Sequence, residues 1–240
     1  MSKSKLRWLM KLGGVSLLSL VMSSQTMAAF VLNGTRFIYE EGKKNTSFEV
    51  TNQAEETYGG QVWIDNTNQG NDTAYLIPVP PFFKVTPKGK QIVRIMRTDS
   101  ALPADQESLF WLNVQEIPPK PKGEVEGGVL AVAINTRVKL IYRPKSLVAG
   151  RENAEKGMRI VRRNGEVWLT NPTPYYFAVT AVKVNGKNVS LSEAVHDRLA
   201  QVALKAEISL GNIALNGAVS VEAVNDWGGT ADYPLTGTGQ

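Results

Sequence analysis

The sequence predicts an all-β protein made of two β-sandwich domains. Short runs of alternating apolar and polar residues, typical of half-buried strands, follow one another from residue 30 onward. Clusters of Gly, Asn, Asp and Pro separate these runs, and no long stretch shows a helical period. At 240 residues, the chain has the length of two domains of ordinary size.

The first predicted domain spans 29–146. Its strand-like segments are spaced as in an immunoglobulin-like sandwich, and they are, in order, 30–39, 46–52, 59–65, 74–87, 90–98, 107–119 and 128–144.

The second predicted domain spans 147–240 and is also immunoglobulin-like. The polar stretch "KSLVAGRENAEKGM" at 145–158 lacks a period-two pattern, so we expect the domain junction there, with one short helix. Asn-Gly pairs at 164–165 and 185–186 are strong hairpin signals. The predicted strands of this domain lie within 159–171, 175–191, 198–211 and 218–229, and a last strand after Asp226 is weakly marked.

Residues 1–28 are typical of a cleavable secretory signal peptide. Basic side chains at positions 3, 5, 7 and 11 precede an apolar run at 12–22, and small residues follow, with cleavage expected after Ala28 or Ala29. The apolar run is shorter than the ~20 residues of a membrane span. We therefore expect export of a mature chain that begins near Ala29.

Removal of this segment changes the charge argument. The whole chain has 27 Lys and Arg against 22 Asp and Glu, and four of the basic residues lie in the signal segment. The mature chain therefore has 23 basic and 22 acidic residues. A nearly neutral chain gives no support for nucleic-acid binding.

The chain has few residues suited to catalysis. It has no cysteine, so no disulfide staples the fold, and one histidine, His196, which rules out a two-histidine metal site. His196 lies among charged neighbours in "SEAVHDRLA", where a solvated loop or turn is expected. No nucleophile elbow, phosphate loop or dinucleotide fingerprint is present, and Glu107, Glu116 and Asp226 are isolated carboxylates. We expect no catalytic residue, no metal site and no cofactor.

The segment "GVLAVAINTRVKLIYRP" at 128–144 has a regular alternation. Leu130, Val132 and Ile134 begin an apolar ladder, whereas Arg137 and Lys139 occupy the opposite face of the same predicted strand. Such a ladder commonly faces its own core. If it is exposed, it would suit donation of a strand to a partner.

Two basic residues in apolar strands allow two interpretations. Arg36 lies in "LNGTRFIYEEG" and Lys139 in "TRVKLIYRP". Charges of this kind often protect a sheet edge or point to solvent. The residues alone leave open whether this pair instead forms a binding site.

Five ordered segments resemble a known family. "GTRFIYEEGKKNTSFEVTN", "ESLFWLNVQEIPPKPK", "TRVKLIYRP", "LTNPTPYYFAV" and "VNDWGG" are similar to the segments that mark the PapD-like periplasmic chaperones of the chaperone-usher pilus pathway. The resemblance covers nearly the whole mature chain. It implies two immunoglobulin-like domains in an L-shaped arrangement with a cleft between them.

The resemblance also implies roles for particular residues. Arg36 and Lys139 would grip the C-terminal carboxylate of a pilus subunit in the cleft. Leu130, Val132 and Ile134 would be the donor residues that fill a groove in the subunit. A salt bridge among Glu116, Arg143 and Asp226 would fix the angle between the domains.

The implied function is that of a periplasmic, non-enzymatic chaperone. Its partners would be pilus subunits and an outer-membrane usher, and it would need neither cofactor nor nucleic acid. The 19 residues between Pro119 and Lys139, together with the absence of cysteine, resemble the short-loop type of the family. Self-association of the free protein through its donor strand stays open.

A pilus structural subunit or adhesin and a secreted carbohydrate-binding sandwich are the alternatives to a chaperone. A pilus structural subunit or adhesin would carry a donor extension at its N-terminus, whereas 30–39 resembles an ordinary first strand. A secreted carbohydrate-binding sandwich would need exposed aromatic residues. Trp63, Trp111 and Trp168 lie in apolar strands, so we expect them in the cores.

Overall fold

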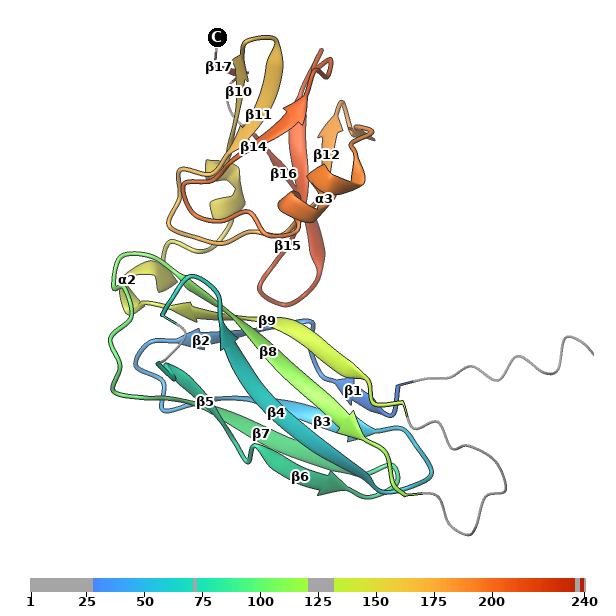
Figure 1. Cartoon of the computed structure of the whole chain (residues 1–240). Helices are drawn as coiled ribbons and strands as arrows, with labels where there is room; N and C mark the ends of the chain where they lie inside the picture. The colour runs from blue at the N-terminus through green and yellow to red at the C-terminus, as the bar shows by residue number, and fades with distance from the viewer. Residues whose placement is uncertain (1–27, 71–72, 121–131, 236–237, 240) are drawn as a thin grey trace, which may run out of the picture.

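Two β-sandwiches form the protein, set at an angle so that the molecule is L-shaped (Figure 1). This computed structural model describes residues 28–70, 73–120, 132–235 and 238–239. Residues 1–27 of the expected signal peptide and the segment 121–131, which contains the predicted donor Leu130, lie outside the described residues. The all-β prediction is confirmed.

The N-terminal sandwich has one sheet of four strands and one of five. The four-stranded sheet runs in the order β1 (Phe30–Leu32), β3 (Thr46–Asn52), β7 (Lys90–Arg97) and β5 (Leu76–Val79). The five-stranded sheet runs in the order β2 (Arg36–Glu40), β9 (Asn135–Arg143), β8 (Ser108–Ile117), β4 (Tyr58–Asn66) and β6 (Phe82–Val85). Alternate residues of each strand enter the core between the sheets, for example Phe48 and Val50 of β3.

Two predicted strands are each divided between the sheets. The segment 30–39 forms β1 in one sheet and β2 in the other, with Asn33 and Gly34 at the crossover. The segment 74–87 divides in the same way into β5 and β6 around Pro80 and Pro81. Proline has no N–H for a sheet ladder, so the second division occurs where pairing is weakest.

The C-terminal sandwich has two four-stranded sheets. One has the order β14 (Glu207–Gly211), β11 (Glu166–Thr170), β10 (Arg159–Arg163) and β17 (Thr238–Gly239). The other has the order β13 (Lys187–Asn188), β12 (Val179–Val184), β15 (Val219–Val224) and β16 (Thr230–Pro234). The helix α3 (Glu193–Leu199) lies near β12 and β14, and it carries an exposed His196, so the expected loop or turn is wrong.

Both predicted Asn-Gly hairpins are confirmed. Asn164 and Gly165 have φ of 51° and 80° between β10 and β11, and Asn185 and Gly186 have φ of 49° and 76° between β12 and β13. Positive φ at both central residues matches the right-handed twist of the strands, and Asn-Gly adopts it at low cost.

The segment between the sandwiches contains α2 (Lys145–Val148) and a 3₁₀ turn, η1 (Ala154–Gly157). The expected division between residues 146 and 147 falls inside α2. None of the helices in the described parts of the chain is both long and apolar enough to cross a membrane.

A small apolar cluster joins the two sandwiches. Leu109 of β8 and Ile141 of β9 pack against Tyr176 of the C-terminal sandwich, and partly buried residues surround them: Ile38, Ala203 and Leu204. The last four residues of β9 are consecutively buried, because the core covers one face of this part of the strand and the second domain covers the other.

Candidate functional site

Four side chains form a row across the five-stranded sheet, on the face turned away from the core. The strand register places Arg36 of β2 opposite Lys139 of β9, Lys139 opposite Trp111 of β8, and Trp111 opposite Asp65 of β4. Directly opposed residues in neighbouring strands have their side chains on the same face. Arg36 and Lys139, which are 103 positions apart in the sequence, are therefore brought together.

Arg36 is buried at the junction of the domains. Its residue is 7% exposed, and Nη1 donates hydrogen bonds to the carbonyl oxygens of Val224 (2.7 Å) and Asn225 (3.3 Å) at the end of β15. Burial lowers the pKa of the guanidinium from its ordinary value, by more than the charge of nearby Asp226 raises it.

Lys139 lies beside Arg36 and is half-buried. Its Nζ donates to the carbonyl oxygen of Ala200 at 2.7 Å, just after α3, and lies 5.5 Å from the centroid of the Trp111 ring. Burial, and then the charge of Arg36, lower the pKa of the ammonium group. Among the described residues, no carboxylate hydrogen-bonds to either cation. Two adjacent cations bonded to neutral carbonyls are suited to binding an anion.

A pocket of about 450 Å³ opens beside Lys139. All of its other lining residues come from the C-terminal sandwich, so it lies between the domains. They are Ala178, Val179, Thr180, His196, Asp197, Ala200 and Val224.

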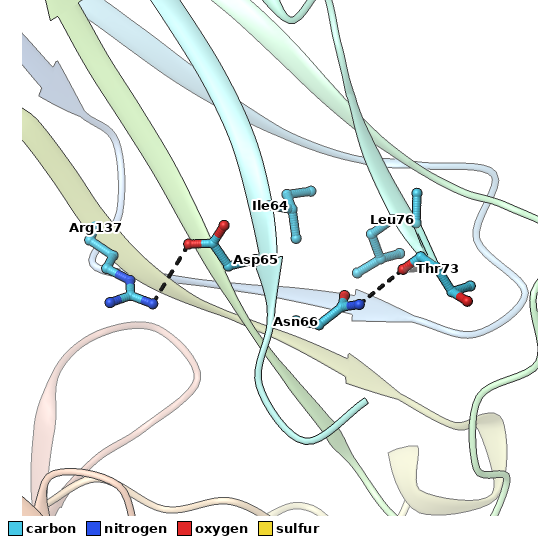
Figure 2. Close-up of a pocket in the computed structure, with 7 residues that line it drawn as sticks. Ile64, Asp65, Asn66, Thr73, Leu76 and Arg137 are labelled. Atoms are coloured by element: carbon cyan, nitrogen blue, oxygen red, sulfur yellow. Dashed lines mark hydrogen bonds and ion pairs between the residues drawn. The ribbon is translucent and has the colours of Figure 1, made fainter. Parts of the chain in front are cut away.

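A second hollow of about 610 Å³ lies at the other end of the row (Figure 2). Figure 2 shows Arg137 reaching toward Asp65, with 3.7 Å between Nη2 and Oδ2, and Asn66 Nδ2 donating to the Thr73 carbonyl at 2.9 Å. The Arg137 guanidinium also lies 4.6 Å from the centroid of the Trp111 ring. Trp111 therefore lies between two cations rather than in the core.

The expectation that Trp63, Trp111 and Trp168 are core residues is wrong. All three are only partly buried, and none belongs to a core cluster. In β4 and β8, the core positions are the alternate ones, such as Val62 and Leu112, so Trp63 and Trp111 lie on the outer face.

One edge of β9 is open over its first half. The strand pairs with β8 from Asn135 to Tyr142, but β2 pairs with it only from Lys139 onward. Within the parts of the chain that the structure describes, no strand lies along the other edge of 135–138. An open strand edge presents unpaired N–H and C=O groups to a partner.

Two of the predicted donor residues are exposed just before β9. Val132 is 62% exposed and Ile134 is 38% exposed. The alternation predicted that both residues lie in the strand, but β9 begins only at Asn135. The Ile134 carbonyl nevertheless accepts a hydrogen bond from the Glu116 N–H at 3.0 Å. The apolar side chains of Val132 and Ile134 therefore face solvent next to the open edge.

Arg143 joins the domains through two carboxylates. Its Nε donates to Glu107 Oε1 at 2.7 Å, while Nη1 and Nη2 donate to the two oxygens of Asp226 at 2.6 and 3.0 Å. The second oxygen of Glu107 accepts from the backbone N–H of Tyr176 at 2.8 Å. Each of these acids therefore connects the N-terminal sandwich to the C-terminal one.

Glu116 is not part of this salt bridge, so that prediction is wrong. Register explains why: Ser108 of β8 pairs with Tyr142, which places the preceding Glu107 beside Arg143. Glu116 lies nine residues further along an extended strand, about 30 Å away at ~3.3 Å per residue. Its Oε2 accepts from the backbone N–H of Phe30 at 3.0 Å. The sequence contained one hint of the correct partner, because Glu107 begins the same family-like segment.

The ion pairs extend into the C-terminal domain. Arg151 makes two hydrogen bonds with buried Glu155, at 2.9 and 2.7 Å, and lies 3.3 Å from Asp226. Burial alone would raise the pKa of Asp226, but the hydrogen bonds and charge of Arg143, followed by Arg151, bring it below the ordinary value. Burial has the larger effect at Glu107 and raises its pKa, despite Arg143.

Fold and site together define a two-domain immunoglobulin-like protein with two adjacent cations at the domain junction and an open strand edge. Comparison with known sequences identifies the family. Residues 29–148 match the family described as "Pili and flagellar-assembly chaperone, PapD N-terminal domain", and residues 153–235 match "Pili assembly chaperone PapD, C-terminal domain". The chain belongs to the PapD-like pilus assembly chaperones, a family of chaperones rather than of enzymes.

Individual relatives agree with this assignment. The chain is 46% identical to the chaperone protein FanE of Escherichia coli over 92% of its own length and 96% of FanE, and 38% identical to FaeE of the same species over 88% and 80%. Among solved structures, it is similar to the periplasmic chaperone SfaE, with 32% identity, a TM-score of 0.67 and coverage of 85% and 97%. It is also similar to one chain of the solved complex of the Salmonella enterica SafA pilin with the SafB chaperone, with 25% identity, a TM-score of 0.72 and coverage of 88% of this chain and 97% of that one.

Proposed function

We propose that this protein is a periplasmic chaperone that binds pilus subunits by donating a strand, anchors their C-terminal carboxylate in the interdomain cleft, and delivers them to an outer-membrane usher. The family supports the chaperone role, and the signal-like segment 1–28 supports export. The matches cover both domains, so they favour this function over a pilus subunit or a carbohydrate-binding protein. The 19 residues between Pro119 and Lys139 support the short-loop type.

The observation that carries the proposal is the pairing of Arg36 with Lys139 at the cleft. Both cations are partly or wholly removed from water, and both are hydrogen-bonded to carbonyl oxygens that carry no full charge. A carboxylate entering beside them would accept charge-assisted hydrogen bonds, each worth roughly 1.5 to 3 kcal/mol. The subunit's C-terminus is a suitable anion, because it ends a strand that can lie along β9.

Strand donation is supported by the open edge of β9. A subunit strand placed there would take the free main-chain groups of 135–138, while Val132 and Ile134 would enter an apolar groove of the subunit. Burying each of these side chains contributes about 1.5 to 3 kcal/mol. Leu130, which lies outside the described residues, stays a predicted third donor. The carboxylate anchor would set the register, since a slip by one residue turns every side chain to the wrong face.

Arg143 is proposed to fix the angle of the cleft. The guanidinium is held by Glu107 from its own domain and by Asp226 from the other, and these three side chains are largely buried. A planar, bidentate group between two carboxylates restrains direction as well as distance. The cleft would thus keep Arg36 and Lys139 at a constant separation from the C-terminal domain.

Co-expression in the periplasm with candidate pilus subunits tests the proposal. Lys139→Ala should abolish recovery of a stable complex, because the carboxylate loses one of its two cations. Lys44→Ala, which removes an exposed lysine from the connection between β2 and β3 of the same domain, is the matched control and should leave the yield unchanged. Normal recovery of the complex with a folded Lys139→Ala variant would show that the cleft is not the anchor.

A further inference from the structure

We propose that the pocket beside Lys139 receives an apolar side chain from one of the last two residues of the bound subunit. The cleft would then select subunits by this side chain as well as by their carboxylate. The inference rests on the proposed function, because it takes the subunit's C-terminus as the group bound at Lys139.

The position of the pocket indicates its occupant. Lys139 is both a proposed anchor of the carboxylate and a wall of the 450 Å³ pocket, and the opposite walls belong to the second domain. A chain end bound at Lys139 Nζ therefore has its last side chains at the pocket mouth. Successive side chains of a strand point to opposite faces, so one of the last two is directed toward the C-terminal domain.

The floor of the pocket is apolar. It is lined by Ala178, Val179 and Val224, of which the first two are buried. The polar backbone groups there already have partners: the N–H of Val224 donates to the Ala178 carbonyl at 2.9 Å, and the Val224 carbonyl accepts from Arg36 at 2.7 Å. An entering side chain would consequently gain free energy by burying apolar surface rather than by making hydrogen bonds.

The polar side chains lie at the rim. His196 and Asp197 come from α3, Thr180 comes from β12, and the Lys139 ammonium is held by the carbonyl of Ala200. His196, Asp197, Thr180 and Ala200 are exposed at the surface of the free protein. A pocket with an apolar floor and a polar rim favours a large apolar or aromatic residue over a small or acidic one.

The pocket beside Arg143, at the same interface, has a different character. It has a similar volume, about 450 Å³, but five of its ten lining residues are charged: Glu40, Arg143, Arg151, Glu152 and Asp226. The buried members among them are held in ion pairs. The apolar floor is thus a property of the pocket at Lys139 and not of the domain junction in general.

The test uses the full-length chaperone and the pilus subunit recovered with it by co-expression. Each of the subunit's last two residues is replaced in turn by alanine, and the affinity is measured by competition against the unchanged subunit. Loss of a leucine-sized or aromatic side chain at the responsible position should weaken binding about 10- to 100-fold. The alanine variant at the other position should bind within about twofold of the original.

Chaperone variants give the reciprocal measurement. Ala200→Leu should fill the pocket from its exposed wall and weaken binding by ~10-fold or more, while Ala194→Leu, at an exposed position of α3 outside the lining, should have no effect. Circular dichroism checks that both variants are folded.

The outcomes separate the inference from the function on which it rests. Suppose that both alanine variants of the subunit and the Ala200→Leu chaperone bind with unchanged affinity, while Lys139→Ala still loses binding. This result would refute the proposed role of the pocket and leave the carboxylate anchor intact. A recovered subunit whose last two residues are both small or acidic would also overturn the pocket. Unchanged binding by Lys139→Ala would instead overturn the anchor.

Discussion

Replacing Glu107 with alanine should weaken the junction between the domains. Its carboxylate is buried and accepts hydrogen bonds from Arg143 Nε at 2.7 Å and from the Tyr176 N–H at 2.8 Å. The substitution removes one of Arg143's two carboxylate partners and leaves a buried backbone N–H without its acceptor. Breaking a buried ion pair in this way costs about 3 to 5 kcal/mol.

Glu116→Ala is the matched control. Glu116 is also a buried carboxylate at the same sheet, but it accepts its hydrogen bond from Phe30, within the N-terminal sandwich. Leaving that single N–H unpaired costs about 1 to 3 kcal/mol. The control should therefore destabilise the protein less and leave the domain orientation unchanged.

Two measurements distinguish the variants. Urea unfolding monitored separately in each domain gives the change in free energy of unfolding, and small-angle X-ray scattering gives the spread of interdomain orientations. We expect Glu107→Ala to broaden the orientations and Glu116→Ala to retain those of the parent. A broadened distribution for Glu116→Ala together with an unchanged one for Glu107→Ala would refute the assignment of Glu107 as the interdomain partner.

The pKa of Asp226 is lowered in the folded state, so its contribution to stability should be complete above the unfolded pKa of about 3.9 and decline as the pH falls through the lower folded value. The difference in unfolding free energy between the parent and Asp226→Asn should accordingly be flat near neutral pH and shrink in acid; a difference that stays constant throughout would contradict the lowered pKa. Leu109→Ala, in the apolar cluster between the domains, should cost about 2 to 5 kcal/mol and alter domain orientation in scattering, whereas Leu112→Ala, in the N-terminal core, should cost a similar amount without altering it. Val132→Asp should change chaperone stability by less than about 0.5 kcal/mol in thermal unfolding, because the side chain is exposed, yet prevent recovery of a subunit complex. If this variant does not fold, Val132 belongs to the core and donation from it is excluded.

Local patterns in the sequence predicted much of the fold. Alternation in 46–52 matches β3, and the Asn-Gly pairs mark both observed hairpins, because strand faces and tight turns depend on neighbouring residues. The same patterns failed where one segment serves two sheets, as in 30–39. A crossover of this kind depends on the strands available to pair with each half, and alternation carries no information about them.

The functional residues show the same division. The family resemblance indicated the position of Arg36, Lys139, Arg143 and Asp226, and the structure brings these residues to the domain junction. It also indicated Glu116, for which the structure substitutes Glu107. Both acids precede or occupy the same strand, so motif context could not separate them; the register of β8 against β9 does so, because it separates them by nearly the whole length of the strand.

The order of residues predicts the strands and turns, because both depend on interactions between near neighbours. It also indicates the two-domain division and the lack of catalytic motifs. The placement of Trp111 outside the core, the open edge of β9 and the pocket beside Lys139 depend instead on which strands pair and on which face the second domain covers. Such contacts join residues as distant as Arg36 and Val224. The free energy of these contacts comes from packing and hydrogen bonding between distant segments, which a local sequence pattern does not report. The cleft therefore forms only when both domains are in place.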